Sequence, residues 1–340
     1  MSESAQAIPP FVKARQSVAL RVAPRPTARE WLIHASLLLI TIVTTTVAGL
    51  VMAAPEVDVA PPPLSTVIDY LLFVPQYYLR SVVALLGFTV QHPHLLADGL
   101  IFSAALLAIL TAHEMGHYVA CRRYGVAATL PFFIPAPPLF LAGTFGAFIK
   151  IKSPIPSRRA LFDIGLAGPL AGFAMALPIA LVGVLSMQPQ VQGGGYGIVF
   201  HDPLLFRLLG RLVGTPLDPY APINPYYMAA WIGLLVTSLN LMPVGQLDGG
   251  HGTFAMFGQR AHKVIGRVAF AAIAVLAVMG IVWYGSPSGF LYTVLLAIML
   301  RVGHPQPEEM EPLGPVRTWI AVVTLIIFAL CFWPFPITIT

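Results

Sequence analysis

Residues 95–123 read LLADGLIFSAALLAILTAHEMGHYVACRR, an apolar run interrupted only by Asp98 before it reaches a cluster of ionisable side chains. A helix needs about 20 mainly apolar residues to cross a bilayer, and this run is long enough. Ionisable side chains within such a run are costly and are functional by default. The stretch therefore predicts a transmembrane helix that carries polar chemistry near one end.

The composition of the whole chain is that of a multi-span membrane protein. Hydrophobic residues make up 57% of the 340 positions and charged residues only 10%, with a mean hydropathy of +0.80. Such a chain spends its length on membrane spans rather than on one soluble core. The net charge of +5 does not indicate a nucleic-acid partner, because the basic residues flank apolar runs, as topology signals do. We expect the lipid bilayer as the surroundings and no nucleic acid.

The hydropathy pattern predicts an all-α polytopic membrane protein with about six or seven transmembrane helices. The predicted spans are 31–54, 95–121, 161–187, 226–249, 264–284, a short one at 288–300, and 318–333. The stretch 64–90 is also apolar but contains Asp69, Pro75 and Arg80. For this stretch we expect an interfacial helix pair rather than another full span.

The distribution of basic residues predicts the orientation. With the N-terminus in the cytosol, 16 of the 19 Lys and Arg residues fall inside, and only Arg80, Arg207 and Arg211 remain outside. Residues 1–30 lack a short apolar core with a small-residue cleavage site, so they predict a cytosolic tail rather than a signal peptide. We expect a bacterial inner-membrane protein whose N-terminus and polar helix end face the cytosol.

The HEMGH sequence at 113–117 has the spacing of a metal site. On a helix, residues i and i+4 share a face, so His113 and His117 can bind one Zn²⁺ while Glu114 acts as a general base. A shuffled chain of this composition would contain about 0.005 such matches to the HExxH pattern. The alternative is a pair of histidines that are satisfied by hydrogen bonds at a helix end.

A catalytic zinc site needs a third protein ligand. The segment 240–250, NLMPVGQLDGG, supplies Asp248 as the only acid near the end of the 226–249 span, at a depth similar to that of His117. Asp248 could instead form a turn or end a helix ahead of its two glycines. Cys121 also shares the histidine face, but it lies roughly 12 Å along the helix axis from His113. The pattern therefore favours Asp248.

The two motifs, in this order, resemble those of the site-2 protease family of intramembrane zinc metalloproteases, over roughly residues 95–252. The resemblance implies hydrolysis of a peptide bond in or near the transmembrane segment of a membrane-protein substrate. It implies zinc ligands at His113, His117 and Asp248, the catalytic base at Glu114, and a substrate-backbone contact at Asn240. Asn240 could instead cross-link helices through hydrogen bonds.

The segment 130–152 is apolar, but four prolines within it exclude a regular helix. Its second half, 143–152, ends in period-2 alternation and predicts a strand. We expect an edge strand of a membrane-associated hairpin, as the resemblance also implies, that pairs with an unwound substrate. Its candidate substrate-binding residues are Gly143, Thr144, Phe145 and Gly146. The alternative is a simple hairpin on the membrane surface.

The chain divides by these patterns into a tail (1–30), a first helix with an interfacial segment (31–94), a catalytic core (95–252) and C-terminal helices (253–340). Glycines in 165–172 predict close packing against the catalytic helices. The connection 188–225 is too short for an inserted PDZ domain, and we expect no CBS pair. His251 could support the site or be solvated. Cys121 and Cys331 fall at opposite membrane faces, so we expect no disulfide between them.

A rival function is a zinc transporter or a catalytically silent scaffold with the same His and Asp ligands. A transport site has no need for an acid directly after the first histidine, so Glu114 favours the protease. The sequence predicts neither the individual substrate nor the oligomeric state.

Overall fold

The computed structural model describes residues 27–54, 59–62, 64, 66–137, 139–187, 198–217, 224–304, 307–309 and 311–339. Within these residues the chain forms nine helices and two small antiparallel sheets. The helices are α1 (Ala28–Ala53), α2 (Val67–Gln91), α3 (His94–Arg123), α4 (Arg158–Leu185), α5 (Leu204–Val213), α6 (Pro225–Asn240), α7 (Asp248–Tyr284), α8 (Ser288–Arg301) and α9 (Pro315–Cys331). The strands are β1 (Phe132–Pro135), β2 (Thr144–Phe148), β3 (Ile198–Phe200) and β4 (Ile337–Ile339).

Five of the described helices, α1, α2, α3, α4 and α7, are long and apolar enough to cross a membrane. Two shorter apolar helices, α8 and α9, accompany them. The predicted all-α polytopic membrane fold is therefore confirmed. The predicted cytosolic tail lies mostly outside the described residues, which begin with the capping box of α1 at Thr27 and Glu30.

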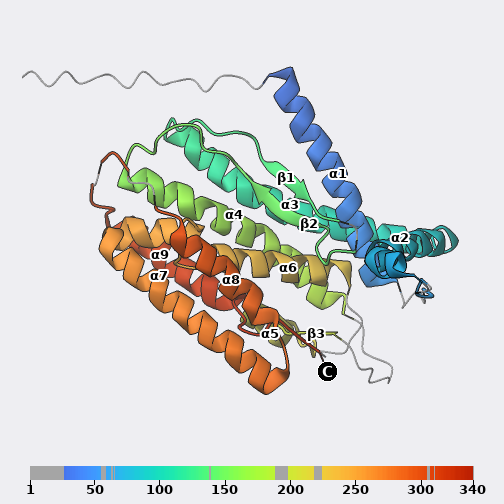
Figure 1. Cartoon of the computed structure of the whole chain (residues 1–340). Coiled ribbons are helices and arrows are strands. Elements are labelled where there is room, and N and C mark those ends of the chain that lie inside the picture. The colour runs from blue at the N-terminus through green and yellow to red at the C-terminus, as the bar shows by residue number, and fades with distance from the viewer. Residues whose placement is uncertain are drawn as a thin grey trace, which may run out of the picture.

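Helix α6 lies in the middle of the bundle, against α3 and α4 (Figure 1). Residues 227–234 are all buried, including Trp231. A helix that is apolar on all sides packs in a core rather than at a surface. Helix α1 packs on the outer side of α3, where the hydroxyls of Thr45 and Ser103 hydrogen-bond at 2.6 Å. The three helices α3, α4 and α6 thus form the rigid frame of the molecule.

The strands β1 and β2 lie between α1 and α3 and pair as an antiparallel hairpin (Figure 1). Phe132 faces Phe148 across the pair, and the register shifts between Ile134 and Pro135. The expected hairpin is confirmed, although β2 ends at Phe148 rather than at residue 152. An isolated bridge between Ala128 and Ile151 continues the pairing past that end.

Two predicted spans are wrong in their bounds. The predicted 226–249 helix stops at Asn240, and Asp248 begins α7 instead of ending α6. Pro243 lacks the amide that would continue the helix, and Gly245 takes a left-handed φ of 56°, so the chain turns there. The predicted 264–284 span is the second part of α7, which breaks at Gly258 with φ 80° and ψ 176°.

The expectation of two helices in 64–90 is also wrong. The structure has a single helix, α2, with Pro75 inside it and a capping box between Thr66 and Asp69. It is long and apolar enough to span, and most of its large side chains are exposed. In Figure 1 it projects away from the bundle. Proline is tolerated within membrane-spanning helices where local adjustment satisfies the freed backbone carbonyl.

Candidate metal centre

Two histidines one turn apart on α3 form the first part of the site. His113 is 4% exposed and His117 is 8% exposed. Their Nε2 atoms lie 3.2 Å apart, and the ring centroids are 4.9 Å apart. The i, i+4 spacing puts both rings on one helix face, as the sequence predicts.

Asp248 completes the group from the first turn of α7. Its Oδ2 lies 3.3 Å from the Nε2 of His113 and 3.4 Å from the Nε2 of His117. Among the described His, Cys, Asp and Glu side chains, these three are the group whose ligand atoms come close enough to hold a metal ion. Cys121 is fully buried in a separate cluster with Val126 and is not part of it.

The spacing of the three ligand atoms fits zinc. A tetrahedral Zn²⁺ with bonds of about 2.0–2.2 Å separates neighbouring ligand atoms by about 3.3 Å. The three measured separations are 3.2, 3.3 and 3.4 Å. Two imidazoles and one carboxylate leave a fourth position open, which is the donor set of a catalytic rather than a structural zinc site.

A backbone carbonyl sets the orientation of His117. Its Nδ1 donates a hydrogen bond of 2.7 Å to the carbonyl oxygen of Ile164, which leaves the lone pair of Nε2 free for a metal. No sequence pattern points to Ile164, because a carbonyl acceptor imposes no residue type. The glycines near Ile164 on α4 are the part of the sequence that indicates close packing of this helix against the histidines.

Helix α4 can approach α3 this closely only because it presents glycine. A Cβ built on Gly168 would lie 2.0 Å from the Nε2 of His117, and one on Gly172 would lie 3.1 Å from the Cβ of His113. A Cβ on Gly165 would meet the Cβ of His251 at 2.6 Å. The glycines predicted to permit close packing therefore face the histidines directly.

Glu114 is 7% exposed and follows His113 on α3. The backbone of Ile149, one residue past the end of β2, lies next to its carboxylate. The carboxylate is thus held between the histidine helix and the hairpin. The sequence carries no signal for Ile149 either, since it too acts through its backbone.

Asn240 ends α6 and reaches the same centre. Its Nδ2 lies 3.3 Å from the Nε2 of His113. The contact joins α6 to α3, which is the helix cross-link considered for this residue. It also puts the amide beside a ligand atom, where a substrate carbonyl would approach, so the two expected roles are compatible.

The four candidate substrate-binding residues differ in their surroundings. Gly143, at φ 65°, lies against the backbone of α1, and a Cβ there would meet the carbonyl oxygen of Thr44 at 2.3 Å. Thr144 is buried and donates to the carbonyl of Ile134, while the amide of Gly146 donates to its hydroxyl. Phe145 is 60% exposed. The first two positions hold the hairpin in place, whereas the ring of Phe145 is mostly exposed and packs against the ring of Phe140, at a centroid distance of 4.9 Å.

His251, one turn after Asp248, is partly exposed and has a side-chain partner. Its Nδ1 lies 2.8 Å from the Nε2 of His304, whose ring stacks on Phe254 with centroids 4.1 Å apart. The interaction ties the segment after α8 to the first turn of α7. His304 was not identified from the sequence.

Comparison with known proteins agrees with this geometry. Residues 101–283 match Peptidase family M50. The chain is 32% identical over 262 residues to the Probable zinc metalloprotease EGY2, chloroplastic, of Oryza sativa subsp. indica, covering 73% of this chain and 45% of that protein. It is 32% identical over 274 residues to the Arabidopsis thaliana protein of the same name, covering 77% of this chain and 47% of that protein.

A third relative is the Probable zinc metalloprotease EGY1, chloroplastic, of Arabidopsis thaliana, which is 31% identical over 241 residues, 67% of this chain and 42% of that protein. The chain therefore spans less than half the length of the curated relatives it matches. The family match covers more than half of the chain and includes both the HEMGH and the LDG motifs. From motif, geometry and match together, the chain belongs to peptidase family M50, the site-2 protease family.

Proposed function

We propose that this chain is an intramembrane zinc metalloprotease that hydrolyses a peptide bond in or beside the transmembrane segment of a membrane protein. The observation that carries the proposal is the triangle of His113, His117 and Asp248 with Glu114 beside it on the same helix. Its ligand spacing suits zinc, and its position within membrane-spanning helices suits a substrate that is itself a membrane protein. We propose residues 95–252 as the catalytic core.

In this proposal His113, His117 and Asp248 hold the metal and Glu114 handles the proton. Zinc bound there supplies Lewis-acid chemistry, which polarises a carbonyl and acidifies water. The Glu114 carboxylate takes the proton from the attacking water and later returns it to the leaving amine. The Asn240 amide lies close enough to the centre to donate a hydrogen bond to a substrate carbonyl. His113, Glu114 and His117 are buried, and Asp248 and Asn240 are only partly exposed, so access of bulk water to the reaction is restricted.

The hairpin offers a strand edge to which an unwound substrate segment can bind. The backbone groups of Lys150 and Lys152 hydrogen-bond to Thr129 and Ala127, whereas the backbone of Ile149 between them lies next to Glu114. Because alternate residues of a strand point to the same side, the amide of Ala147 lies on the Glu114 edge too. A substrate segment that adds as a strand there would expose its peptide bonds next to the base.

Replacement of Glu114 by Gln tests the reaction. The variant should lose cleavage of membrane-protein substrates while it keeps its zinc, because the amide retains the shape of the side chain but cannot accept a proton. Zinc content by elemental analysis and proteolysis in reconstituted vesicles measure the two properties separately. A transporter or scaffold would keep zinc flux or partner binding in the same variant. Undiminished proteolysis would contradict the assignment of the base.

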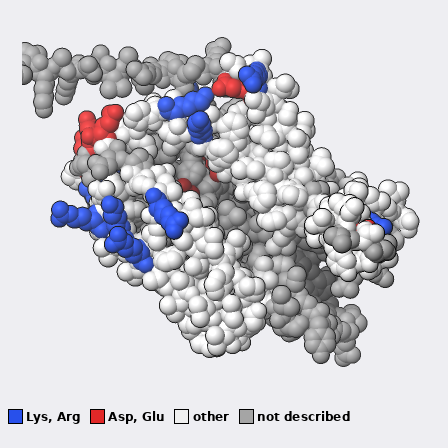
Figure 2. Space-filling view, in the orientation of Figure 1, with Lys and Arg blue, Asp and Glu red and all other residues white. Residues whose placement is uncertain are grey.

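The membrane and the orientation are also part of the proposal. Most Lys and Arg side chains visible in Figure 2 lie toward the upper left of the molecule, where α1 begins and one end of α7 lies. The 16-to-3 partition of basic residues supports an orientation with this end in the cytosol. We propose a bacterial inner membrane. The names of the plant relatives place those proteins in chloroplasts, so fractionation of native cells is the test.

A further inference from the structure

An apolar groove runs along the side of α3 that faces away from the metal centre. Helices α3 and α9 both pack against α4, and the groove lies between them. Its volume is about 990 Å³. Met115, Val119, Leu170 and Ile320 are among the side chains that line it. A groove of this size and polarity is large enough for a drug-sized or larger apolar ligand.

The groove is not part of the path to the catalytic residues. Met115 and Val119 follow His113 and His117 by two positions, which is about 200° around an α-helix. They therefore face nearly opposite to the ligand histidines. A substrate helix lying in this groove would be on the far side of α3 from Glu114.

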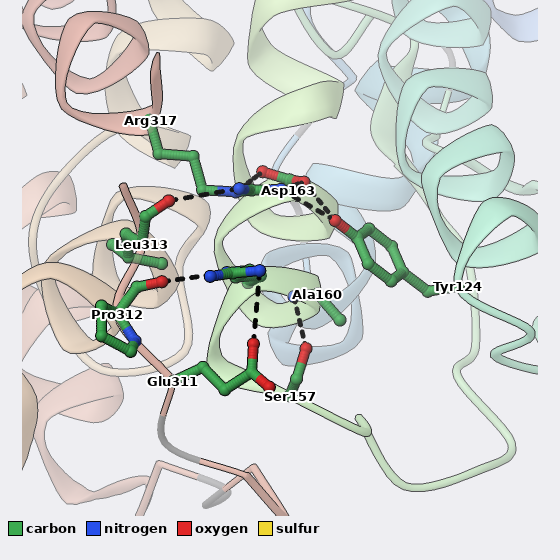
Figure 3. Close-up of polar contacts among 9 residues, drawn as sticks. Tyr124, Ser157, Ala160, Asp163, Glu311, Pro312, Leu313 and Arg317 are labelled. Atoms are coloured by element: carbon green, nitrogen blue, oxygen red, sulfur yellow. Dashed lines mark hydrogen bonds and ion pairs between the residues drawn. The ribbon is translucent and has the colours of Figure 1, made fainter. Parts of the chain in front are cut away.

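One end of the groove carries an Arg–Asp pair whose charges compensate each other. Arg317 donates two hydrogen bonds to Asp163, at 2.8 and 2.6 Å, and a third to the hydroxyl of Tyr124 at 3.1 Å (Figure 3). The Tyr124 hydroxyl in turn donates to Asp163. Burial, together with the bond to Asp163, raises the pKa of the Tyr124 hydroxyl, so it stays protonated. The charge of Asp163 is thus compensated by Arg317, which joins α9 to α4.

A second basic residue at this end is uncompensated. Arg123, the last residue of α3, lines the groove and is exposed. Within the described part of the chain it has no hydrogen-bond or ion-pair partner. Glu311, at the same end of the molecule, pairs with Arg159 at 3.3 Å, and neither it nor Glu308 or Glu309 lines the groove. The groove therefore combines apolar walls with one free positive charge at its mouth, at the basic end of the molecule.

We propose that this groove binds one anionic phospholipid, with an acyl chain along the apolar wall of α3 and the phosphate at Arg123. The charge at the mouth selects an anionic headgroup, and basic pockets between transmembrane helices are known to hold such headgroups. An acyl chain there would fill the space behind the HEMGH turn, beside Met115 and Gly116. The bound lipid would thereby support the packing of the metal-binding helix.

The test is lipid binding to the purified full chain, read by native mass spectrometry with dioleoyl phosphatidylglycerol and dioleoyl phosphatidylcholine as probes. Wild-type protein should hold phosphatidylglycerol more tightly than phosphatidylcholine. Arg123→Gln should weaken phosphatidylglycerol binding about fivefold, the effect expected of one basic residue at a membrane surface, and leave phosphatidylcholine unchanged. Arg123→Lys should restore the preference. The matched control is Arg122→Gln, which removes the same charge from the adjacent exposed residue outside the groove lining.

A second pair of variants tests the apolar wall. Val119→Trp places a large ring in the groove and should weaken both lipids, whereas Leu100→Trp, on the same helix but outside the lining, should weaken neither. The two positions are matched in exposure, at 46% and 49%. Equal affinity of the wild type for both lipids, or equal effects of Arg122→Gln and Arg123→Gln, would overturn the proposal. The proposal would also be overturned if the Val119→Trp variant still bound both lipids but no longer bound a synthetic polyleucine transmembrane peptide, because the groove would then hold a helix and not a lipid.

Discussion

Substitution of Gly168 by alanine is the sharpest test of how α4 positions the metal ligands. The added Cβ would lie 2.0 Å from the Nε2 of His117, and 2.4 and 2.5 Å from its Cδ2 and Cε1. Non-bonded carbon and nitrogen atoms approach to about 3.5 Å, so the ring must move by more than 1 Å. Zinc ligands tolerate displacements of about 0.2 Å. We therefore expect the variant to lose His117 as a ligand.

The expected magnitude follows from the loss of that ligand. Removing a mere hydrogen-bond partner of a metal ligand weakens metal binding about 10- to 100-fold, and displacing the ligand itself should exceed this. Zinc affinity should fall at least about 100-fold, which corresponds to about 2.7 kcal/mol. General unfolding is not the expected cause, because alanine is favoured over glycine in a helix by about 1 kcal/mol.

The assay is competition for zinc between the purified protein and a chelator of known affinity, with helix content measured in parallel by circular dichroism. Gly87→Ala on α2 is the control, since a Cβ there meets nothing within 4 Å. Gly172→Ala, with its contact at 3.1 Å to the Cβ of His113, should give a smaller loss. If Gly168→Ala binds zinc as tightly as Gly87→Ala, then α4 does not set the position of His117, and the reasoning fails.

Three further outcomes are expected. Asp248→Ala should lose activity and much of the bound zinc, whereas Cys121→Ser should keep both. Elemental analysis measures the zinc content, which should be about one ion per chain in the wild type. The reverse result would remove Asp248 from the site. Cysteine introduced at Pro216 should react with an impermeant thiol reagent added outside and cysteine at Arg260 should not, and the opposite pattern would invert the proposed orientation. Ala147→Pro should depress cleavage without releasing zinc, because it removes a backbone amide from the edge of β2 that lies toward Glu114. Ala147→Val keeps that amide and should cleave normally. Equal cleavage by both variants would mean that β2 is only part of a surface hairpin.

The parts of the site that the sequence predicts well are those fixed by local spacing. The separation of His113 from His117 by four residues determines their shared face once a helix forms, and the apolar run around them makes that helix certain. The prolines of 130–152 likewise exclude a helix whatever the tertiary context. These predictions needed no knowledge of how the helices pack.

The parts that it could not predict depend on backbone atoms and on long-range packing. Ile164 and Ile149 contact His117 and Glu114 through main-chain groups, so their side chains carry no signal. The pairing of His251 with His304 joins positions 53 residues apart. Asp69, Pro75 and Arg80 predict an interrupted helix in 64–90, whereas α2 accommodates all three in one helix.

The break between α6 and α7 is the correction with the largest chemical consequence. In a continuous helix, Asn240 and Asp248 would lie eight residues apart, about 12 Å along the axis, and could not both reach one centre. In the structure the Asn240 amide and the Asp248 carboxylate each lie 3.3 Å from the same Nε2 of His113. The turn that makes this possible requires glycine at 245, with its left-handed φ, and at 249, where a Cβ would lie 2.0 Å from the carbonyl oxygen of Leu241. The spacing of the NLMPVGQLDGG motif is thus that of a tight turn which brings the end of one helix and the start of the next to a single metal-binding group.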